Sequence, residues 1–243
     1  MTKGSVERDR DKAVVSLSGG MDSTTVLVSA LASGLEVECV GFTYGAKHNP
    51  YENQAAAKIA EHYNVPFTLM TLDELMKNFN SNLMKTGGDV PEGHYEQANM
   101  TQTVVPGRNI IFSAVLAGVA WNLNAQEVWM GIHSGDHEIY PDCRPEFFYS
   151  MRRAIECGTD DNVTLMAPFL TGDKTSIIAW GLQHDVPYHL TRTCYKDQEI
   201  ACGKCGACQE RLEAFQNNKI EDPIEYESRE IKQRDCSALH HDS

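Results

Sequence analysis

Short apolar runs rich in β-branched residues alternate with longer stretches of helical periodicity along most of this chain. The apolar runs predict strands, and the periodic stretches predict helices. Strands are expected at residues 13–17, 37–44, 66–70, 127–132 and 163–169, and helices at 22–33, 52–64, 107–124, 145–158 and 174–185. Such alternation is typical of an α/β fold in which helices cover both faces of a parallel sheet. We therefore expect a five-stranded parallel sheet.

Polar motifs follow four of the expected strands. "SGGMDS" follows the first strand, "YGAKH" the second, "HSGDHEIYPDCR" the fourth and "PFLTGDK" the fifth. In parallel α/β sheets, ligands bind beyond the carboxyl ends of the strands. All four motifs are therefore expected on one rim of the sheet. The irregular segment 78–106, rich in Asn, Gly and Pro, is expected to be a lid or a disordered loop.

The motif "SGGMDS" has the composition of an anion-binding turn. Two glycines permit a sharp turn and a close approach of backbone amides, and the helix that follows directs its N–H groups into the turn. Ser18 and Ser23 add hydroxyl donors, and Asp22 suits a Mg²⁺ ion held between its carboxylate and phosphates. The order of residues differs from the Walker pattern. The competing interpretation is a plain turn in which Ser18 caps the helix and Asp22 charges its N-terminus.

Four of the eight cysteines lie close together in the sequence. Cys194, Cys202, Cys205 and Cys208 follow the spacing C-x₇-C-x₂-C-x₂-C, with glycines between the later ligands. Four thiolates in this arrangement fit a tetrahedral Zn²⁺ site of the closed, structural kind. An iron–sulfur cluster uses the same ligands and stays open as an alternative. A third alternative is a set of unrelated reduced cysteines.

Composition narrows the class of protein. The chain of 243 residues has 21 Lys and Arg against 34 Asp and Glu, and this net charge of −13 disfavours nucleic-acid binding. No run reaches the ~18–20 apolar residues of a membrane span, and the polar N-terminus does not resemble a secretory signal. We therefore expect a cytoplasmic protein. Its expected parts are a disordered tail at 1–11, an α/β domain with the anion-binding turn at 12–190, a zinc-binding appendage packed on that domain at 191–216 and a polar C-terminal extension at 217–243.

The glycine-rich motif resembles the PP-loop of the N-type ATP pyrophosphatases. This resemblance implies that ATP is attacked at its α-phosphorus, that an acid or amide oxygen becomes adenylated, and that the loop holds the leaving pyrophosphate. The motif characterises a superfamily, which includes amide-forming synthetases and tRNA thiolases, and does not identify the substrate.

The PP-loop and the four cysteines together resemble the 7-cyano-7-deazaguanine synthase family. The similarity extends from about residue 13 to residue 212 and includes "FTYGAKH", "VPGRN", "YPDCR", the spacing from Pro168 to Lys174, and "TCY…CGKCGAC". It implies a Rossmann-like sheet with a zinc appendage, usually in a homodimer. It also implies conversion of 7-carboxy-7-deazaguanine, ammonia and ATP into 7-cyano-7-deazaguanine, through an adenylated carboxylate and an amide.

The resemblance assigns roles to residues on the rim. Asp22, Lys174 and Arg108 are the expected catalytic residues. ATP and Mg²⁺ are expected at Ser16, Leu17, Ser18, Gly19, Gly20, Met21, Asp22, Ser23, Thr24, Tyr44, Lys47, His48, Arg108, Asn109 and Lys174. The deazaguanine is expected at Asp136, Tyr140, Asp142 and Arg144.

Three positions depart from the family pattern. "YGAKH" replaces the common "YGQRH", "HSGDHEIYPDCR" replaces "ETDFSGYPDCR", and Ser176 stands where many members have an acidic residue. Three other functions therefore stay open. The first is an adenylating enzyme that joins the activated carboxylate to another amine, the second a tRNA thiolase, and the third a non-catalytic nucleotide-binding module.

Overall fold

The computed structural model describes residues 12–133, 135 and 139–232. The tail predicted at 1–11 and the last part of the predicted extension, 233–243, lie outside the described residues. Five strands form one parallel sheet in the order β3-β2-β1-β4-β5. The strands are β1 (Lys12–Ser16), β2 (Glu36–Thr43), β3 (Phe67–Thr71), β4 (Glu127–Trp129) and β5 (Thr164–Met166). The predicted five-stranded parallel sheet is confirmed.

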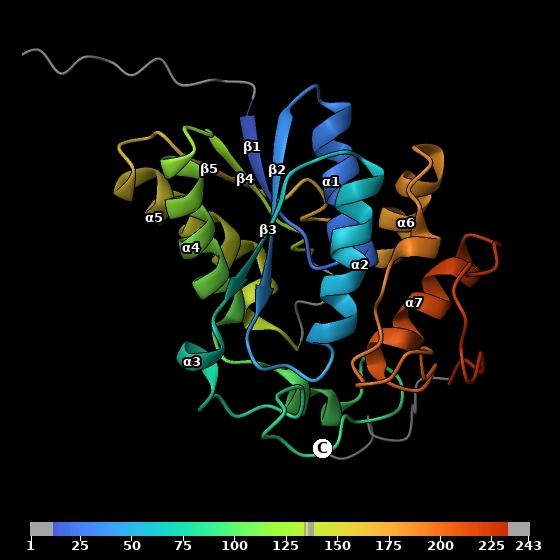
Figure 1. Ribbon diagram of the computed structural model, residues 1–243. Coiled ribbons are helices and arrows are strands. Elements are labelled where there is room, and N and C mark those ends of the chain that lie inside the picture. Colours follow the sequence, from blue (N-terminus) through green and yellow to red (C-terminus); the bar gives the residue numbers. More distant parts are fainter. Residues whose placement is uncertain (1–11, 134, 136–138, 233–243) are drawn as a thin grey trace, which may run out of the picture.

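Helices cover both faces of this sheet (Figure 1). Figure 1 shows α4 and α5 on one side and α1 and α2 on the other, with α6 and α7 beyond them. The α-helices are α1 (Met21–Ala32), α2 (Asn49–His62), α3 (Asp73–Met76), α4 (Arg108–Asn122), α5 (Pro145–Gly158), α6 (Lys174–Gln183) and α7 (Gly206–Asn217). The 3₁₀ turns given for the described residues are η1 (Ala98–Thr103), η3 (Pro141–Cys143) and η4 (Tyr188–Leu190). The sequence patterns predicted five of these α-helices and missed α3 and α7.

The apolar side chains of β1 explain why helices cover both faces of the sheet. Successive residues of a strand point to opposite faces. Val14 packs with residues of α4 and α5, whereas Ala13 and Val15 pack with residues of α1 and α2. All three side chains are fully buried, so β1 has no face left for solvent. This is the burial expected of a central strand in a parallel sheet.

The fourth and fifth strands are shorter than their apolar runs. The runs predicted strands over 127–132 and 163–169, but β4 ends at Trp129 and β5 at Met166. Just beyond β4, the Met130 N–H still donates to the Met166 carbonyl at 3.0 Å, and Met130, Gly131 and Ile132 line a cleft. Met130 and Ile132 also belong to the buried core, so the apolar composition continues past the end of the strand.

One stretch, Ala98–Asn122, is long and apolar enough to cross a membrane by length and composition alone. It is interrupted, because Val104 is extended and Gly107 has a left-handed backbone with φ 63°. The part that forms α4 packs on β1 and β4, and Leu116 is fully buried. The stretch is therefore a 3₁₀ turn followed by a core helix of the sheet.

Helix α7 joins the cysteine segment to the rest of the molecule. It packs along α6, and Arg211 is fully buried and bonded through Nε and one terminal nitrogen to the two Asp222 oxygens, at 2.7 and 2.9 Å. Arg211 also donates to the hydroxyl oxygens of Thr191 and Thr193. These bonds fix α7 against both the preceding segment and the chain that follows it.

Candidate functional site

A cleft with an open volume of about 1080 Å³ lies at the carboxyl edge of the sheet. Most of the predicted ATP contacts meet there: Ser16, Leu17, Ser18, Gly20, Met21, Asp22, Ser23, Tyr44, His48, Arg108, Asn109 and Lys174 line it. They come from the loop before α1, the segment after β2, and the first residues of α4 and α6. Cys143 of the motif "HSGDHEIYPDCR" also lines it, so all four motifs predicted on the rim reach one cavity, together with the start of α4.

The glycine-rich loop is held by its own serines and by a distant segment. The Ser18 N–H donates to Ser23 Oγ at 3.2 Å, and the two hydroxyl groups lie 3.0 Å apart. The Arg192 N–H donates to the Gly19 carbonyl at 2.8 Å. Gly20 is the N-cap of α1 and has no side chain over the helix end. The loop is thus rigid while the first N–H groups of α1 face the cleft, the arrangement that binds phosphate.

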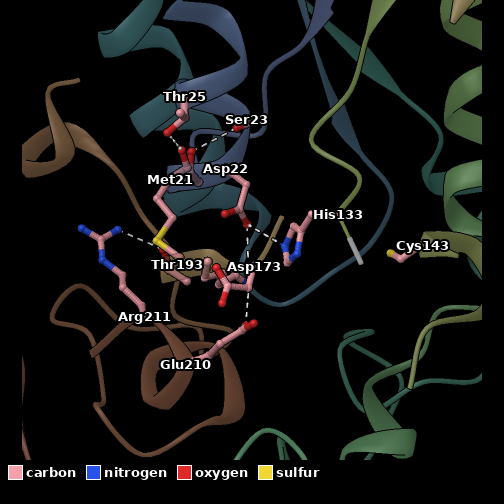
Figure 2. Close-up of polar contacts among 12 residues, drawn as sticks. Met21, Asp22, Ser23, Thr25, His133, Cys143, Asp173, Thr193, Glu210 and Arg211 are labelled. Carbon is pink, nitrogen blue, oxygen red and sulfur yellow. Dashed lines mark hydrogen bonds and ion pairs between the residues drawn. The ribbon is translucent and has the colours of Figure 1, made fainter. Parts of the chain in front are cut away.

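Asp22 lies at the centre of a buried charge network (Figure 2). Asp22 Oδ2 is 3.6 Å from Lys174 Nζ and 3.8 Å from His133 Nε2. Lys174 Nζ also donates to Glu210 Oε2 at 2.5 Å. Burial alone raises the pKa of the Asp22 carboxyl, but Lys174 and His133 outweigh it and hold that pKa well below its usual range. Asp22 is therefore an anion at neutral pH.

The second oxygen of Asp22 fits a metal ion. Asp22 Oδ1 is buried and has no hydrogen-bond partner among the described residues. A buried carboxylate oxygen without a partner is costly, and Mg²⁺ favours carboxylate together with phosphate oxygens. Because Asp22 begins the first turn of α1 beside the phosphate-binding loop, its donor set fits Mg²⁺ bound to ATP.

The opposite wall of the cleft combines arginine, tyrosine and a neutral histidine. Burial, with Arg108 and Arg192 nearby, lowers the pKa of His48 to about 3. His48 Nε2 lies 3.1 Å from the Tyr44 hydroxyl and 3.5 Å from Glu52 Oε2. Burial raises the pKa of Glu52 to about 8 despite the same two arginines. At neutral pH His48 and Glu52 are therefore both mainly uncharged, and the arginines provide the positive charge of this wall.

Several predicted residues lie elsewhere. Gly19 and Thr24 sit behind the loop, and Lys47 donates its ammonium protons to carbonyl oxygens of Asn82, Gly87 and Gly88 rather than lining the cleft. Lys47 therefore fastens the segment 82–88 to the loop after β2.

Of the predicted substrate residues, too, only some line a cavity. Asp142 Oδ2 accepts from the Asn109 N–H at 2.9 Å, and so caps the start of α4. Neither Asp142 nor Arg144 lines the cleft or the cavity beside it. Tyr140 does line that second cavity, and Asp136 lies outside the described residues.

The second cavity opens beside this cleft. It has an open volume of about 650 Å³ and shares Tyr195 and Ala207 with the cleft. Aromatic and apolar side chains line it together with two carboxylates: Tyr95, Glu96, Met100, Tyr140, Tyr195 and Glu210. The Tyr140 and Thr103 hydroxyl groups lie 2.6 Å apart at its wall. The cavity suits a flat polar heterocycle of the size of a nucleobase.

The four cysteines converge on one point. The Sγ atoms of Cys194, Cys202, Cys205 and Cys208 all lie within 4.8 Å of one another, and all four residues are fully buried. Two backbone N–H groups donate to Cys202 Sγ at 3.3 Å. Hydrogen bonding from Cys194 lowers the pKa of Cys202, while bonding to the other three cysteines raises the pKa of Cys208. A bound cation lets all four ionise together, so the donor set fits Zn²⁺.

Four residues of the site escaped sequence reasoning. Glu210 contacts Lys174, His133 contacts Asp22, and Glu52 and Arg192 line the cleft. His133 is the first residue of the rim motif "HSGDHEIYPDCR", but nothing in the sequence assigned it a role. The other three lie in no recognised motif, and Glu210 and Arg192 reach the cleft only through the packing of segments distant in sequence.

Comparison with known proteins points to one family. The family model of the queuosine biosynthesis protein QueC matches residues 12–219. A 7-cyano-7-deazaguanine synthase of Alteromonas mediterranea is 45% identical over 217 residues, which cover 89% of this chain and 99% of the relative. That of Caldicellulosiruptor saccharolyticus is 44% identical over 89% of this chain and 96% of the relative. Among solved structures, the U34-tRNA thiolase NcsA from Methanococcus maripaludis aligns at 14% identity and a TM-score of 0.49, over 87% of this chain and 66% of the thiolase.

Proposed function

The chain belongs to the family of the queuosine biosynthesis protein QueC, the 7-cyano-7-deazaguanine synthases, and on that premise we propose how its cleft makes the nitrile. The substrates are 7-carboxy-7-deazaguanine, ammonia and ATP, and the enzyme is an ATP-dependent C–N ligase. The observation that carries the proposal is the Asp22 carboxylate with its unpartnered oxygen, set between the phosphate-binding loop and Lys174.

ATP occupies the cleft with its β- and γ-phosphates on the loop from Ser18 to Ser23. Mg²⁺, when bound at Asp22, neutralises charge on the phosphate oxygens. Lys174 and Arg108 face the same space and stabilise the pyrophosphate as it leaves. Tyr44 and Arg108 belong to the wall opposite the loop, which leaves that side of the cleft for the α-phosphate and adenine.

Chemistry dictates the order of steps. A carboxylate oxygen attacks the α-phosphorus, the bond from that phosphorus to the bridging oxygen breaks, and pyrophosphate leaves. Ammonia then adds to the carboxyl carbon, a proton is lost and AMP leaves with the activated oxygen, which gives the amide. In a second activation the amide oxygen attacks the α-phosphorus, pyrophosphate leaves and the nitrogen loses one proton. Loss of AMP and of the remaining N–H proton then gives the nitrile. Each oxygen removed from the carbon thus requires one activation.

The deazaguanine occupies the second cavity. Glu96 and Glu210 line it and supply carboxylates of the kind that accept hydrogen bonds from base N–H groups, while tyrosines supply flat faces for the ring. The cavity adjoins the cleft at Tyr195, so a carboxylate on the ring reaches the α-phosphate. Of the four residues predicted to bind the deazaguanine, Tyr140 is the one that lines this cavity.

Zinc is the proposed metal of the four-cysteine site, in a structural role. All four ligands are buried cysteines, which leaves no coordination position for a substrate. All seven described cysteines are free of disulfides, which supports the predicted cytoplasmic location.

A homodimer is the proposed assembly. Ile110 and Trp121 on α4 and Tyr149 on the adjoining α5 are 40–60% exposed, so these two helices present an apolar surface. Sedimentation at micromolar concentration tests this directly, and a monomer at that concentration contradicts it.

The product test incubates the enzyme with 7-carboxy-7-deazaguanine, ammonium and ATP·Mg²⁺ and follows the heterocycle by mass spectrometry. Nitrile formation by the wild-type protein and its loss in Asp22→Asn support the proposal. Accumulation of the adenylate without amide or nitrile would favour an enzyme that uses another amine. Undiminished nitrile formation by Asp22→Asn would refute the assigned role of the loop.

A further inference from the structure

The glycine-rich loop before α1 lies between α2 and the backbone of Arg192. Gly19 is so close to α2 that a Cβ added to it would collide with the Glu52 carbonyl oxygen. The Gly19 carbonyl oxygen accepts a hydrogen bond from the Arg192 N–H at 2.8 Å, and a Cβ on Gly20 would lie 3.4 Å from the Arg192 carbonyl oxygen. The backbone of Arg192 therefore contacts both glycines of the loop.

The side chain of Arg192 is bonded to the spacer between the first two cysteines, residues 195–201. Its guanidinium donates to the carbonyl oxygens of Lys196, Gln198 and Glu199. Arg192 is only 8% exposed, so these bonds lie away from bulk solvent. A guanidinium that bonds three carbonyl oxygens of one short segment has little freedom to move relative to that segment.

The same guanidinium also contacts α2. Its central carbon lies 4.9 Å from the centre of the Tyr51 ring, within the range of a cation–π contact. Tyr51 directly precedes Glu52, the residue whose carbonyl oxygen lies against Gly19. Arg192 therefore contacts both the loop and the turn of α2 on which the loop packs.

A different arginine holds the neighbours of Arg192. The hydroxyl oxygens of Thr191 and Thr193 accept hydrogen bonds from the buried guanidinium of Arg211, which lies on α7. These bonds connect the segment to α7, whereas the Arg192 side chain connects it to α2 and to the spacer. Truncation of Arg192 therefore leaves the segment attached to the molecule but removes the support behind the bond to Gly19.

We propose that Arg192 is a positioning residue for the glycine-rich loop: its side chain, anchored on α2 and on the spacer between Cys194 and Cys202, holds its backbone N–H against Gly19. The inference rests on the proposed function, in which this loop binds the phosphates of ATP. A loop that is already ordered loses less conformational freedom when the phosphates bind, so the affinity is higher. The contacts of Arg192 also link the cysteine segment to the nucleotide cleft.

Hydrogen–deuterium exchange tests the positioning without any ligand. It is measured on full-length, zinc-loaded protein, for the amides of residues 17–24 and, as an internal reference, for those of β1. In Arg192→Met the amides of the loop are expected to exchange about fivefold faster than in wild type, the effect of about one lost hydrogen bond, while the amides of β1 exchange as before. Unchanged exchange in the loop would overturn the inference.

Arg229→Met is the matched control. Arg229 also donates to backbone carbonyl oxygens, and its guanidinium lies 5.2 Å from the centre of the Tyr226 ring, but its partners belong to the chain that follows α7. This variant is expected to exchange as wild type does at residues 17–24. Equal acceleration in the two variants would mean a general loss of stability and would overturn the inference.

Pyrophosphate binding separates positioning from a direct charge contact. Isothermal titration calorimetry gives the Kd of inorganic pyrophosphate with Mg²⁺ for each variant. Arg192→Lys keeps the positive charge, but a single ammonium group cannot bond three carbonyl oxygens and cover the ring. Arg192→Met and Arg192→Lys are both expected to bind pyrophosphate about fivefold more weakly than wild type, in parallel with faster exchange of the loop.

Two outcomes of the titration contradict different claims. Wild-type affinity in Arg192→Lys, with a loss confined to Arg192→Met, would show that charge rather than position matters and would overturn the inference alone. A wild-type protein that binds no pyrophosphate would overturn the proposed function, and the inference with it.

Discussion

The two adjacent glycines of the glycine-rich loop should differ strongly in how well they tolerate substitution by alanine. Gly19 has φ +85°, and a Cβ there would lie 2.3 Å from the Glu52 carbonyl oxygen and 2.6 Å from the Ala56 nitrogen. Both contacts are backbone atoms of α2, which no rotamer change can move. At Gly20 a Cβ would meet Ser18 Oγ at 3.3 Å and the Arg192 carbonyl at 3.4 Å, and φ is −77°.

The magnitudes follow from these contacts. For Gly19→Ala, the left-handed backbone costs about 1 kcal/mol and displacement of α2 about 1–3 kcal/mol, so the free energy of unfolding falls by about 2–4 kcal/mol. For Gly20→Ala, the contacts are tight but relieved by small shifts, and the expected change is within about 1 kcal/mol.

Urea unfolding followed by circular dichroism measures both variants. At a slope of about 2–3 kcal/mol per molar urea, Gly19→Ala should lower the midpoint by about 1 M, and Gly20→Ala by much less. Affinity for the α,β-methylene analogue of ATP should fall in Gly19→Ala as well, because the added Cβ pushes the loop away from α2. Equal midpoints for the two variants would refute the assigned packing of the loop against α2.

Three further predictions test other parts of the molecule. Burial raises the pKa of Glu52 to about 8, so the folded state keeps a proton that the unfolded state releases above about pH 4.5, and this group lowers the stability as the pH rises between those two values. Glu52→Gln should therefore raise the melting temperature above that of wild type by more at pH 9 than at pH 5. An equal difference at the two pH values would contradict the buried, protonated state of Glu52. Arg211→Met should lower the free energy of unfolding by about 3–5 kcal/mol, because Asp222 is left buried and unpaired, whereas adding Asp222→Leu should recover most of the loss in the same urea experiment. Cys202→Ser should abolish stoichiometric zinc binding and lower the free energy of unfolding by at least about 3 kcal/mol, since structural zinc sites contribute about 10 kcal/mol or more in small zinc domains. Thermal unfolding together with metal analysis checks both. Unchanged stability in the zinc-free variant would contradict a structural site.

The sheet could be predicted because its signals are local. Each strand and most helices are marked by their own apolar pattern, and the rule that ligands bind at the carboxyl edge brought Asp22, Arg108 and Lys174 to one cleft. Strand ends could not be predicted as well, because Met130 and Ile132 lie beyond the end of β4 yet stay in the buried core.

The charge network could not be predicted, because it depends on contacts between distant segments. Glu210 meets Lys174 across 36 positions, and only the packing of α7 on α6 brings them together. Lys47 shows the converse, since its position after β2 indicated ATP while its ammonium fastens the segment 82–88. Residue type and rim position identify candidates, but packing decides which of them face the ligand.

In the proposed reaction, a carboxylate oxygen attacks the α-phosphorus of ATP in the cleft around Asp22. Substrate labelled with ¹⁸O in both carboxylate oxygens tests this step directly, with AMP examined by mass spectrometry after conversion to nitrile. The label is expected in AMP, one atom for each activation. Label recovered in phosphate with ADP as the nucleotide product, or only in water, would contradict it.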